Sequence, residues 1–163
     1  MSLGRRWLML ARDAVGTGSC GSGYCYAPIS AARNKARALE LIDRVLNRHD
    51  VGALNDFTSN PEVVASGASL LRAFPDLEAD VRWIVADGDM TVVFHDVRGT
   101  QHGPWLFVQE PTGRRVETSF VLAFRFDDDG QIVDQWLGSN FVQMFVQLGW
   151  GFAPVGQVVP GRE

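Results

Sequence analysis

The sequence has few of the features that mark a metal-binding, membrane or nucleic-acid-binding protein. It contains two cysteines, Cys20 and Cys25, and no further Cys or His follows at zinc-finger spacing. We expect both cysteines to be free thiols, and a disulfide between them is the alternative. No apolar run approaches the roughly 20 residues of a membrane span. The net charge of −4 and the lack of a Lys/Arg cluster argue against nucleic acid. We expect a cytoplasmic protein without a metal site.

Three common catalytic patterns are also missing. The chain has no glycine-rich phosphate loop before a helix, no G-x-S-x-G nucleophile elbow and no HExxH pair. These absences argue against the nucleotide-dependent, serine-hydrolase and zinc-protease classes.

The length and composition suit one domain with a flanking segment at each end. The chain has 163 residues, of which 46% are hydrophobic and 21% charged. An apolar run at 7–11 follows Arg5 and Arg6, but it is too short for an export signal, and Arg12 and Asp13 interrupt it. We expect a weakly ordered extension at 1–30, a domain at 31–150 and a surface tail at 151–163.

The first part of the domain has helical periodicity. Apolar residues recur every three or four positions from Ala38 to Leu46, which predicts an amphipathic helix. A short helix is expected at 50–54, followed by a break at Asn60 and Pro61. Another short helix is expected at 68–74, before Pro75.

The second part has the alternation of β-strands and ends in a hairpin and a helix. Strands are expected at 78–86, with Ala79, Val81, Trp83 and Val85 on one face, and at 90–98. A longer strand begins at about Arg114, the turn Asp127–Gly130 reverses the chain, and a last strand covers 132–136. A short closing helix is expected after this strand, and it ends at about Gly149. The order predicts an α+β domain with helices on one face of a curved sheet.

Several short segments, in this order, resemble the SnoaL-like polyketide cyclases of the nuclear-transport-factor-2-like group. They are FPDL at 74–77, DGD at 87–89, RGT at 98–100, PTGR at 111–114, DGQIVDQW at 129–136 and QLG at 147–149. The resemblance covers about 34–149. It implies a conical barrel whose curved, mainly antiparallel four-stranded sheet and N-terminal helices enclose an apolar pocket. It also implies ring closure by intramolecular aldol condensation without a cofactor, although fold alone does not fix function.

The acid–base residues that the resemblance implies are largely replaced. Leu137 stands at the position of the family's catalytic aspartate, and Asn140 stands at a second acidic position. A histidine that some members carry corresponds to Leu122. The remaining candidates for acid–base catalysis are His95, on a predicted strand between Val93 and Val97, and Asp134. His95 is alternatively a buried histidine whose ring is satisfied by a backbone group. Asp134 is alternatively a structural partner in a cross-strand pair.

Other polar and aromatic residues are candidates for holding a ligand. Aromatic rings can stack on a flat substrate, amides can orient a carbonyl, and His102 lies in a glycine-rich loop. The candidate ligand-binding residues are Trp83, His102, Trp105, Gln135, Trp136, Asn140 and Phe145.

Two functions follow from these observations. The first is a cyclase-type enzyme that performs cofactor-free proton transfer on a hydrophobic carbonyl compound, with hydroxylase-, hydratase- and isomerase-like relatives as variants. The second is a small-molecule-binding protein without catalysis, because Leu137 cannot move a proton. An ionisable side chain inside the pocket would favour the enzyme. The resemblance also implies a homo-oligomer, with a dimer favoured, formed by the exposed sheet face.

Overall fold

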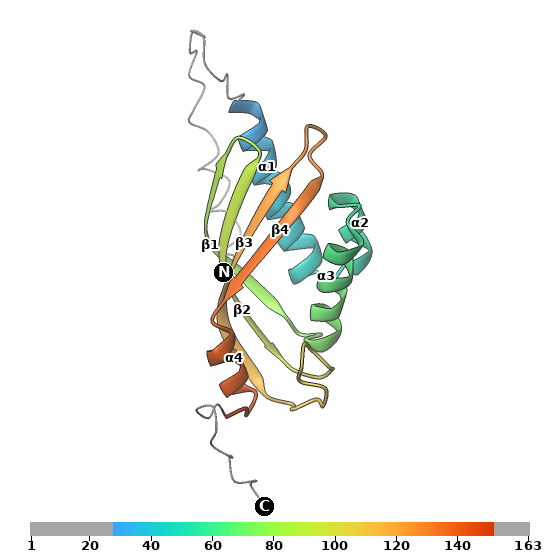
Figure 1. Cartoon of the computed structure of the whole chain (residues 1–163), viewed down its shortest axis with the longest axis vertical. Helices are drawn as coiled ribbons and strands as arrows, with labels where there is room; N and C mark the ends of the chain where they lie inside the picture. The colour runs from blue at the N-terminus through green and yellow to red at the C-terminus, as the bar shows by residue number, and fades with distance from the viewer. Residues whose placement is uncertain (1–27, 152–163) are drawn as a thin grey trace, which may run out of the picture.

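The computed structural model describes residues 28–151, which form helices packed on one side of an open antiparallel sheet (Figure 1). The helical part contains α1 (Pro28–Leu41), a π-helical continuation (Ile42–Asn47), a 3-10 turn (Val51–Ala53), α2 (Leu54–Phe57) and α3 (Pro61–Ala73). The rest contains β1 (Glu78–Asp87), β2 (Met90–Thr100), β3 (Arg115–Phe126), β4 (Ile132–Ser139) and α4 (Phe141–Gln147). The strand order β1-β2-β3-β4 confirms the predicted meander. Cys20, Cys25 and most of the two flanking segments lie outside the described residues.

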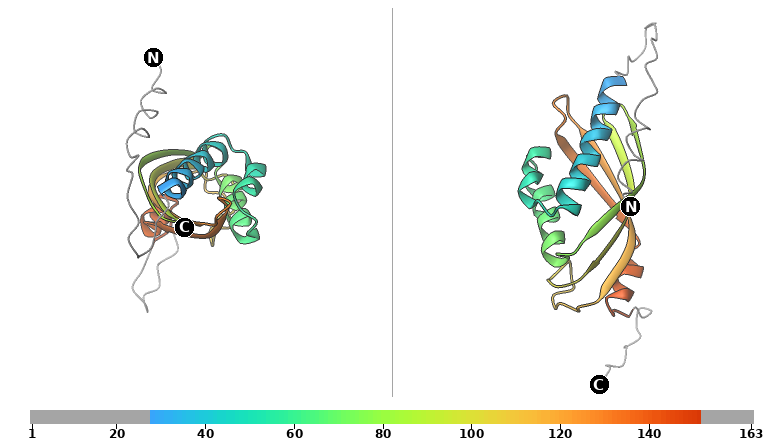
Figure 2. Two further views of the ribbon diagram at one scale, coloured as in Figure 1. Left: turned by 90° about the horizontal axis from the view of Figure 1, so that it is seen from above. Right: turned by 180° about the vertical axis from the view of Figure 1, so that it is seen from behind.

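The sheet curves around α1, and α2 and α3 lie against its open side (Figure 2). The inner face of β3 is as expected, with Phe120, Leu122, Phe124 and Phe126 all buried. The sheet does not close on itself, so the helices complete the enclosure. Phe57 of α2 is fully buried and lies under the guanidinium of Arg37, 4.5 Å from the ring centre.

The turn between β3 and β4 is built from its own acidic residues. Asp127 Oδ1 accepts hydrogen bonds from the backbone N–H groups of Asp129 and Gln131. Gly130 takes a φ of 81°, which a side chain rarely tolerates. Arg33 of α1 donates hydrogen bonds to the carbonyls of Asp127 and Asp128, which fixes the hairpin to the helix.

Helix α3 is longer than the sequence indicated. The predicted helix covered 68–74, but α3 begins at Pro61, the residue read as a break. Proline is compatible with the first helical position, since its missing N–H would have no partner there. Asn60 caps the helix, and its side-chain oxygen accepts a hydrogen bond from Glu62 N at 2.9 Å.

Two β-bulges change which residues face the helices. The ladder between β1 and β2 shifts between Val81 and Trp83, so Arg82 has no residue paired with it across the ladder. The prediction that Trp83 and Val85 share a face with Ala79 and Val81 was therefore wrong. Both lie on the outer face, where Trp83 stacks on Phe94 at 5.3 Å. A second shift in the β3–β4 ladder reverses the alternation after Ile132.

No helix within residues 28–151 is long and apolar enough to cross a membrane.

Candidate functional site

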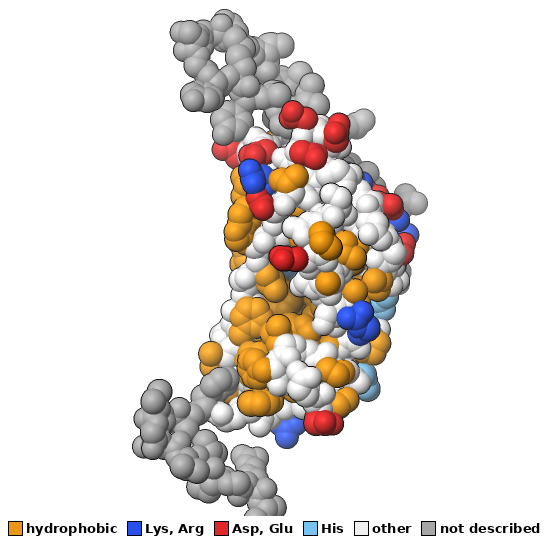
Figure 3. Space-filling model, turned by 45° about the vertical axis from the view of Figure 1, so that its right-hand side comes forward, with side chains coloured by type: hydrophobic (Ala, Val, Ile, Leu, Met, Phe, Trp, Pro, Cys, Tyr) orange, Lys and Arg blue, Asp and Glu red, His pale blue; other side chains and the backbone are white. Residues whose placement is uncertain are grey.

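An apolar cavity lies between the inner face of the sheet and the helices. Its volume is about 60 Å³. In the space-filling view, hydrophobic side chains surround a hollow in the surface (Figure 3). The sheet contributes one wall of the cavity, and the segment from α1 to α3 contributes the other. The cavity is lined by Leu41, Val45, Leu46, Leu54, Val63, Ser66, Gly67, Leu70, His95, Phe120, Leu122, Gln135 and Leu137.

His95 is the ionisable side chain in this cavity. It lies on the inner face of β2, between Val81 of β1 and Phe120 of β3 in the ladders. The side chain has no solvent exposure, and neither ring nitrogen has a partner at hydrogen-bond geometry, although the backbone of Val93 and the charge of Asp96 partly offset the effect of burial on its pKa. The ring of Phe120 packs edge-on against the imidazole at 5.9 Å. A buried polar group without a protein partner is uncommon, and such groups in proteins are met by a bound ligand or an ordered water.

Burial in this apolar environment lowers the pKa of His95 from 6.5 to about 4. At neutral pH the imidazole is therefore uncharged, with one nitrogen that donates a hydrogen bond and one that accepts. Such a ring can donate to a carbonyl oxygen and take up a proton.

Gln135 and Ser66 are the other polar side chains at the cavity. Gln135 follows the bulge in β4, opposite Phe124, which turns it toward the helices. Ser66 comes from the middle of α3 on the other wall. The side chain of Gln135 can donate and accept hydrogen bonds, so it can orient a ligand carbonyl. His95 and Gln135 are the two predicted site residues that the structure brings together.

Leu122 and Leu137 occupy adjacent positions on the cavity wall. They are cross-strand neighbours in the β3–β4 ladder, and both line the cavity. These are the positions where the resemblance implies a histidine and an aspartate. Leu137 is 39% exposed, which places it at the solvent side of the cavity.

Asp134 does not face the cavity. It pairs with Arg125 across the β3–β4 ladder, and Arg125 donates two hydrogen bonds to Asp134 Oδ2, from Nε at 2.8 Å and from Nη2. Both side chains lie on the outer face, because the bulge at Val133 turns Asp134 away from Ile132. The structure therefore favours the cross-strand pair over the catalytic role for Asp134.

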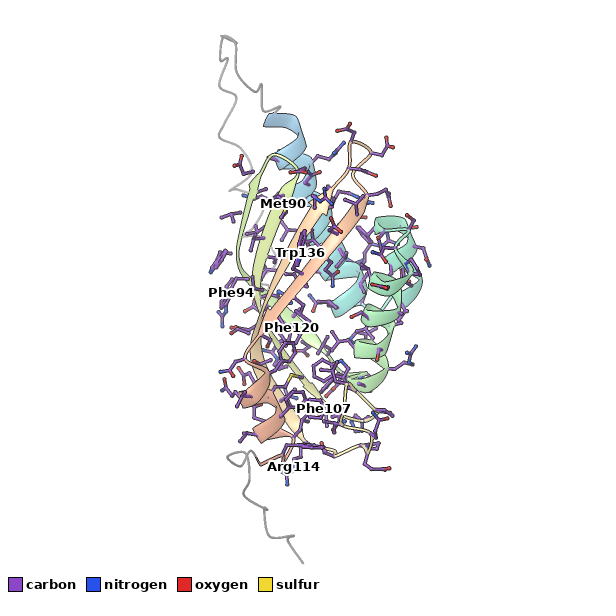
Figure 4. All side chains as sticks on the ribbon, in the orientation of Figure 1. Met90, Phe94, Phe107, Arg114, Phe120 and Trp136 are labelled. Carbon is purple, nitrogen blue, oxygen red and sulfur yellow. The ribbon has the colours of Figure 1, made fainter. Side chains whose placement is uncertain are left out.

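Four predicted ligand-binding residues also lie away from the cavity. Trp83 and Trp136 are half exposed, and both lie on the outer face of the sheet. Figure 4 shows Phe94, the stacking partner of Trp83, projecting away from the helices. His102 is exposed in the loop after β2, and Asn140 is the N-cap of α4, where its Oδ1 accepts a hydrogen bond from Gln143 N.

The remaining two predicted residues, Trp105 and Phe145, belong to an aromatic cluster beside the cavity. Both are buried, and their ring centres are 6.4 Å apart. Phe141 connects the cluster to the cavity, since its ring lies 6.4 Å from that of Phe120. These residues pack the end of the sheet against α4. They support the cavity wall and do not line it.

The helical half of the cavity was missing from the predicted site. Leu41, Val45 and Leu46 were predicted as the apolar face of a helix, but periodicity does not say whether such a face meets side chains or a cavity. Ser66 and Gly67 fall in a stretch of α3 that was not predicted to be helical. Their small size was the available signal, because Gly67 lets Leu54 pack directly against the helix, where a Cβ would lie 2.9 Å from Leu54 Cδ1.

Comparison with known proteins places this geometry in a family. The family model for SnoaL-like polyketide cyclases matches residues 36–148. AclR from Streptomyces galilaeus is 30% identical, with a TM-score of 0.62 over 74% of this chain and 98% of AclR. A protein from Jannaschia sp. CCS1, described as SnoaL-like, is 25% identical, with a TM-score of 0.65 over 77% of this chain and 97% of its own.

A third structure has a similar extent of overlap. IdmH from Streptomyces antibioticus is 25% identical, with a TM-score of 0.58 over 72% of this chain and 99% of IdmH. The comparison with curated protein sequences gives no significant match. The matched residues include all four strands and the whole cavity lining, so the family match and the cavity concern the same part of the chain. The chain belongs to the SnoaL-like polyketide cyclase family.

Proposed function

We propose that this protein is an enzyme that performs cofactor-free acid–base chemistry, of the aldol-cyclisation class, on a hydrophobic carbonyl compound bound in the cavity. The observation that carries the proposal is His95, fully buried in an apolar cavity with both ring nitrogens unpartnered. IdmH and the Jannaschia protein, both described as proposed polyketide cyclases, support the same class.

In the proposed reaction His95 transfers one proton. A nitrogen of the neutral imidazole takes a proton from a carbon that lies between two carbonyl groups, where the proton is already acidic. The amide of Gln135 donates a hydrogen bond to the enolate oxygen that forms. The enolate carbon then attacks a second carbonyl carbon of the same molecule. The new alkoxide oxygen recovers the proton from the imidazolium, so no proton is gained or lost overall.

The low pKa of His95 fits a short-lived imidazolium better than a stable one. The apolar wall disfavours the cation, so the proton is returned readily once the carbon–carbon bond has formed. Leu137, in place of a carboxylate, adds no counter-charge that would stabilise the imidazolium. Proton transfer therefore requires a substrate with an unusually acidic C–H group, which a β-dicarbonyl compound supplies.

The test is exchange of the acidic proton of a small model substrate. Ethyl benzoylacetate, an uncharged aromatic β-keto ester, is incubated with the protein in D₂O, and loss of the C–H signal is followed by NMR. We expect faster exchange than in the protein-free sample, and we expect His95→Phe to abolish the acceleration. Thr91→Val is the matched control, because Thr91 is also buried and unpartnered on the inner face of β2 but does not line the cavity.

Two alternatives predict different results. A non-catalytic binding protein would bind the ester without accelerating exchange, and His95→Phe would change affinity alone. A hydroxylase-type reaction is favoured by the identity of 30% with AclR, which is described as a proposed hydroxylase. It would incorporate oxygen from ¹⁸O₂ into the product, which aldol cyclisation does not.

We also propose a homodimer that buries the outer face of the sheet. Trp83, Val85 and Trp136 are each about half exposed on this face. Trp83 stacks on Phe94, so the aromatic surface continues from β1 to β2. A contiguous apolar surface of this kind is characteristic of an interaction site, and a two-fold pair of identical faces covers it on both copies.

A further inference from the structure

The cavity is much smaller than the ligand it is proposed to hold. Its volume of about 60 Å³ has room for only a few water molecules, at roughly 10–15 Å³ each. A cavity that binds benzene measures about 150 Å³. An aromatic ligand can therefore reach His95 only if one wall of the cavity moves.

Two of the walls are firmly held. The sheet wall is fixed by the ladders on both sides of β2 and β3. The wall formed by α1 and its π-helical continuation is also rigid, since Leu41, Ile42, Val45 and Leu46 are all at most 6% exposed. Displacing either wall would break hydrogen-bond ladders or expose a large part of the core.

Helix α3 is anchored at both ends, and between them it contacts the core through Val63 and through Gly67, which packs against Leu54. Its C-terminal end is anchored by buried Leu71 and Ala73, and the carbonyl of Ala73 accepts hydrogen bonds from His102 N and Gly103 N. Before its N-terminal end, Thr58 Oγ1 donates a hydrogen bond of 2.6 Å to the carbonyl of Ile132 in β4. The middle of the helix reads Ala-Ser-Gly-Ala-Ser at 65–69, and none of these residues is buried.

We infer that the N-terminal part of α3, Pro61–Leu70, is a movable wall that swings away from β4 to admit the ligand to His95. Leu71–Phe74 act as the hinge, and the hydrogen bond from Thr58 to Ile132 keeps the wall closed. The inference rests on the cavity being the ligand site of the proposed function. It does not depend on the chemistry of His95.

The unpartnered imidazole favours closure of α3 over a bound ligand. The ring nitrogens of His95 have no protein partner at hydrogen-bond geometry in the closed cavity. A ligand carbonyl supplies the missing partner, and its apolar part replaces contacts with Val63 and Leu70 of α3. A carbonyl that accepts a hydrogen bond from the imidazole therefore stabilises the closed position of α3. Opening breaks the core contacts of Val63, Val64 and Leu70, whereas the residues at 65–69 are not buried and add little to its cost.

The first test measures association kinetics with 2-acetyl-6-dimethylaminonaphthalene, an uncharged aromatic ketone whose fluorescence depends on its surroundings. If α3 must open first, the observed rate constant levels off as the ketone concentration rises. A rate constant that rises linearly over the whole range would overturn the inference. Because the readout is binding, a protein that binds this ketone but catalyses no exchange would refute the proposed function and leave the movable wall standing.

The second test compares the same replacement, threonine by valine, at two positions. Thr58→Val removes the hydrogen bond to Ile132 and also the one that Thr58 Oγ1 accepts from Asn60 N. We expect the plateau rate to rise about fivefold or more, since the loss of one hydrogen bond of ordinary strength accounts for about fivefold. Thr91→Val is the control, since the Thr91 hydroxyl is buried without a partner. We expect its plateau rate to equal that of the unmodified protein. An equal change in both variants, or no change in either, would overturn the role of Thr58.

Hydrogen exchange locates the movement without any substitution. We expect the backbone amides of 64–69 to exchange much faster than those of β2 and β3, and to slow when the ketone is bound. Exchange in 64–69 as slow as in β2 would show that α3 stays closed and would refute the inference.

Discussion

Replacing His95 by phenylalanine should change how the stability of the protein depends on pH. The pKa of His95 is lowered from 6.5 to about 4 by burial, so the unfolded chain binds a proton more tightly than the folded protein. Above pH 6.5 the titration of His95 does not change the free energy of unfolding. As the pH falls from 6.5 toward 4, it lowers the free energy of unfolding progressively. Below about pH 4 both states are protonated and the loss is complete.

The size of the effect follows from this difference in pKa. Each unit of pKa corresponds to 1.36 kcal/mol, so the full loss is about 3 kcal/mol. Between pH 7.5 and pH 5 the loss is about 2 kcal/mol, a large part of the ~5–15 kcal/mol by which a domain is stable. His95→Phe should abolish this contribution. At pH 7.5 it should also stabilise the fold, because it removes two unpartnered polar atoms.

Urea unfolding at several pH values between 5 and 7.5 measures the prediction. Asp96 also has a lowered pKa, because Ser119 and Arg82 donate hydrogen bonds to it, but a carboxylate affects stability mainly below this range. Subtracting the variant's free energy of unfolding from that of the unmodified protein isolates His95. A difference that stays constant from pH 5 to 7.5 would show that His95 is not buried as a neutral imidazole.

Three further predictions concern other parts of the fold. Trp83→Glu and Trp136→Glu, each placing a charge on the outer face of the sheet, should yield monomers in analytical ultracentrifugation without changing the far-UV circular dichroism; an unchanged dimer would rule out this interface. Gly130→Ala should lower the free energy of unfolding by about 1–2 kcal/mol, because φ is 81° there, whereas Gly151→Ala, with open space around it, should have little effect. Asn60→Ala should cost about 1 kcal/mol by removing the N-cap of α3, as measured by thermal unfolding; no loss would mean that the cap contributes nothing.

Much of the fold follows from local patterns. The alternation along β3 predicted its inner face, because each side chain of a strand points opposite to its neighbour and only one face meets the core. The turn at Asp127–Gly130 was recognisable for the same local reason, since Gly130 supplies the positive φ. The order of short segments identified the family before any distance was known.

The candidate site was harder to predict because it depends on two β-bulges, each of which inserts one residue that has no partner across the ladder. Arg82 and Val133 are the unpaired residues at the bulges, and each reverses the alternation after it. One bulge moves Trp83 to the outer face. The other turns Gln135 toward the cavity and Asp134 away from it. A bulge arises from pairing with a distant strand, so the strand's own sequence does not reveal it.

The sequence by itself determined the α+β order of elements, the four-stranded meander, the family and the isolated position of His95 among valines on one strand. Only the tertiary structure decided that His95 lacks hydrogen-bond partners, since its surroundings come from β1, β3 and the helices. It also decided that Gln135 joins His95 while Asp134 pairs with Arg125, and that the small residues of α3 stand beside the cavity. Such facts depend on contacts between segments far apart in the chain, which local periodicity does not encode.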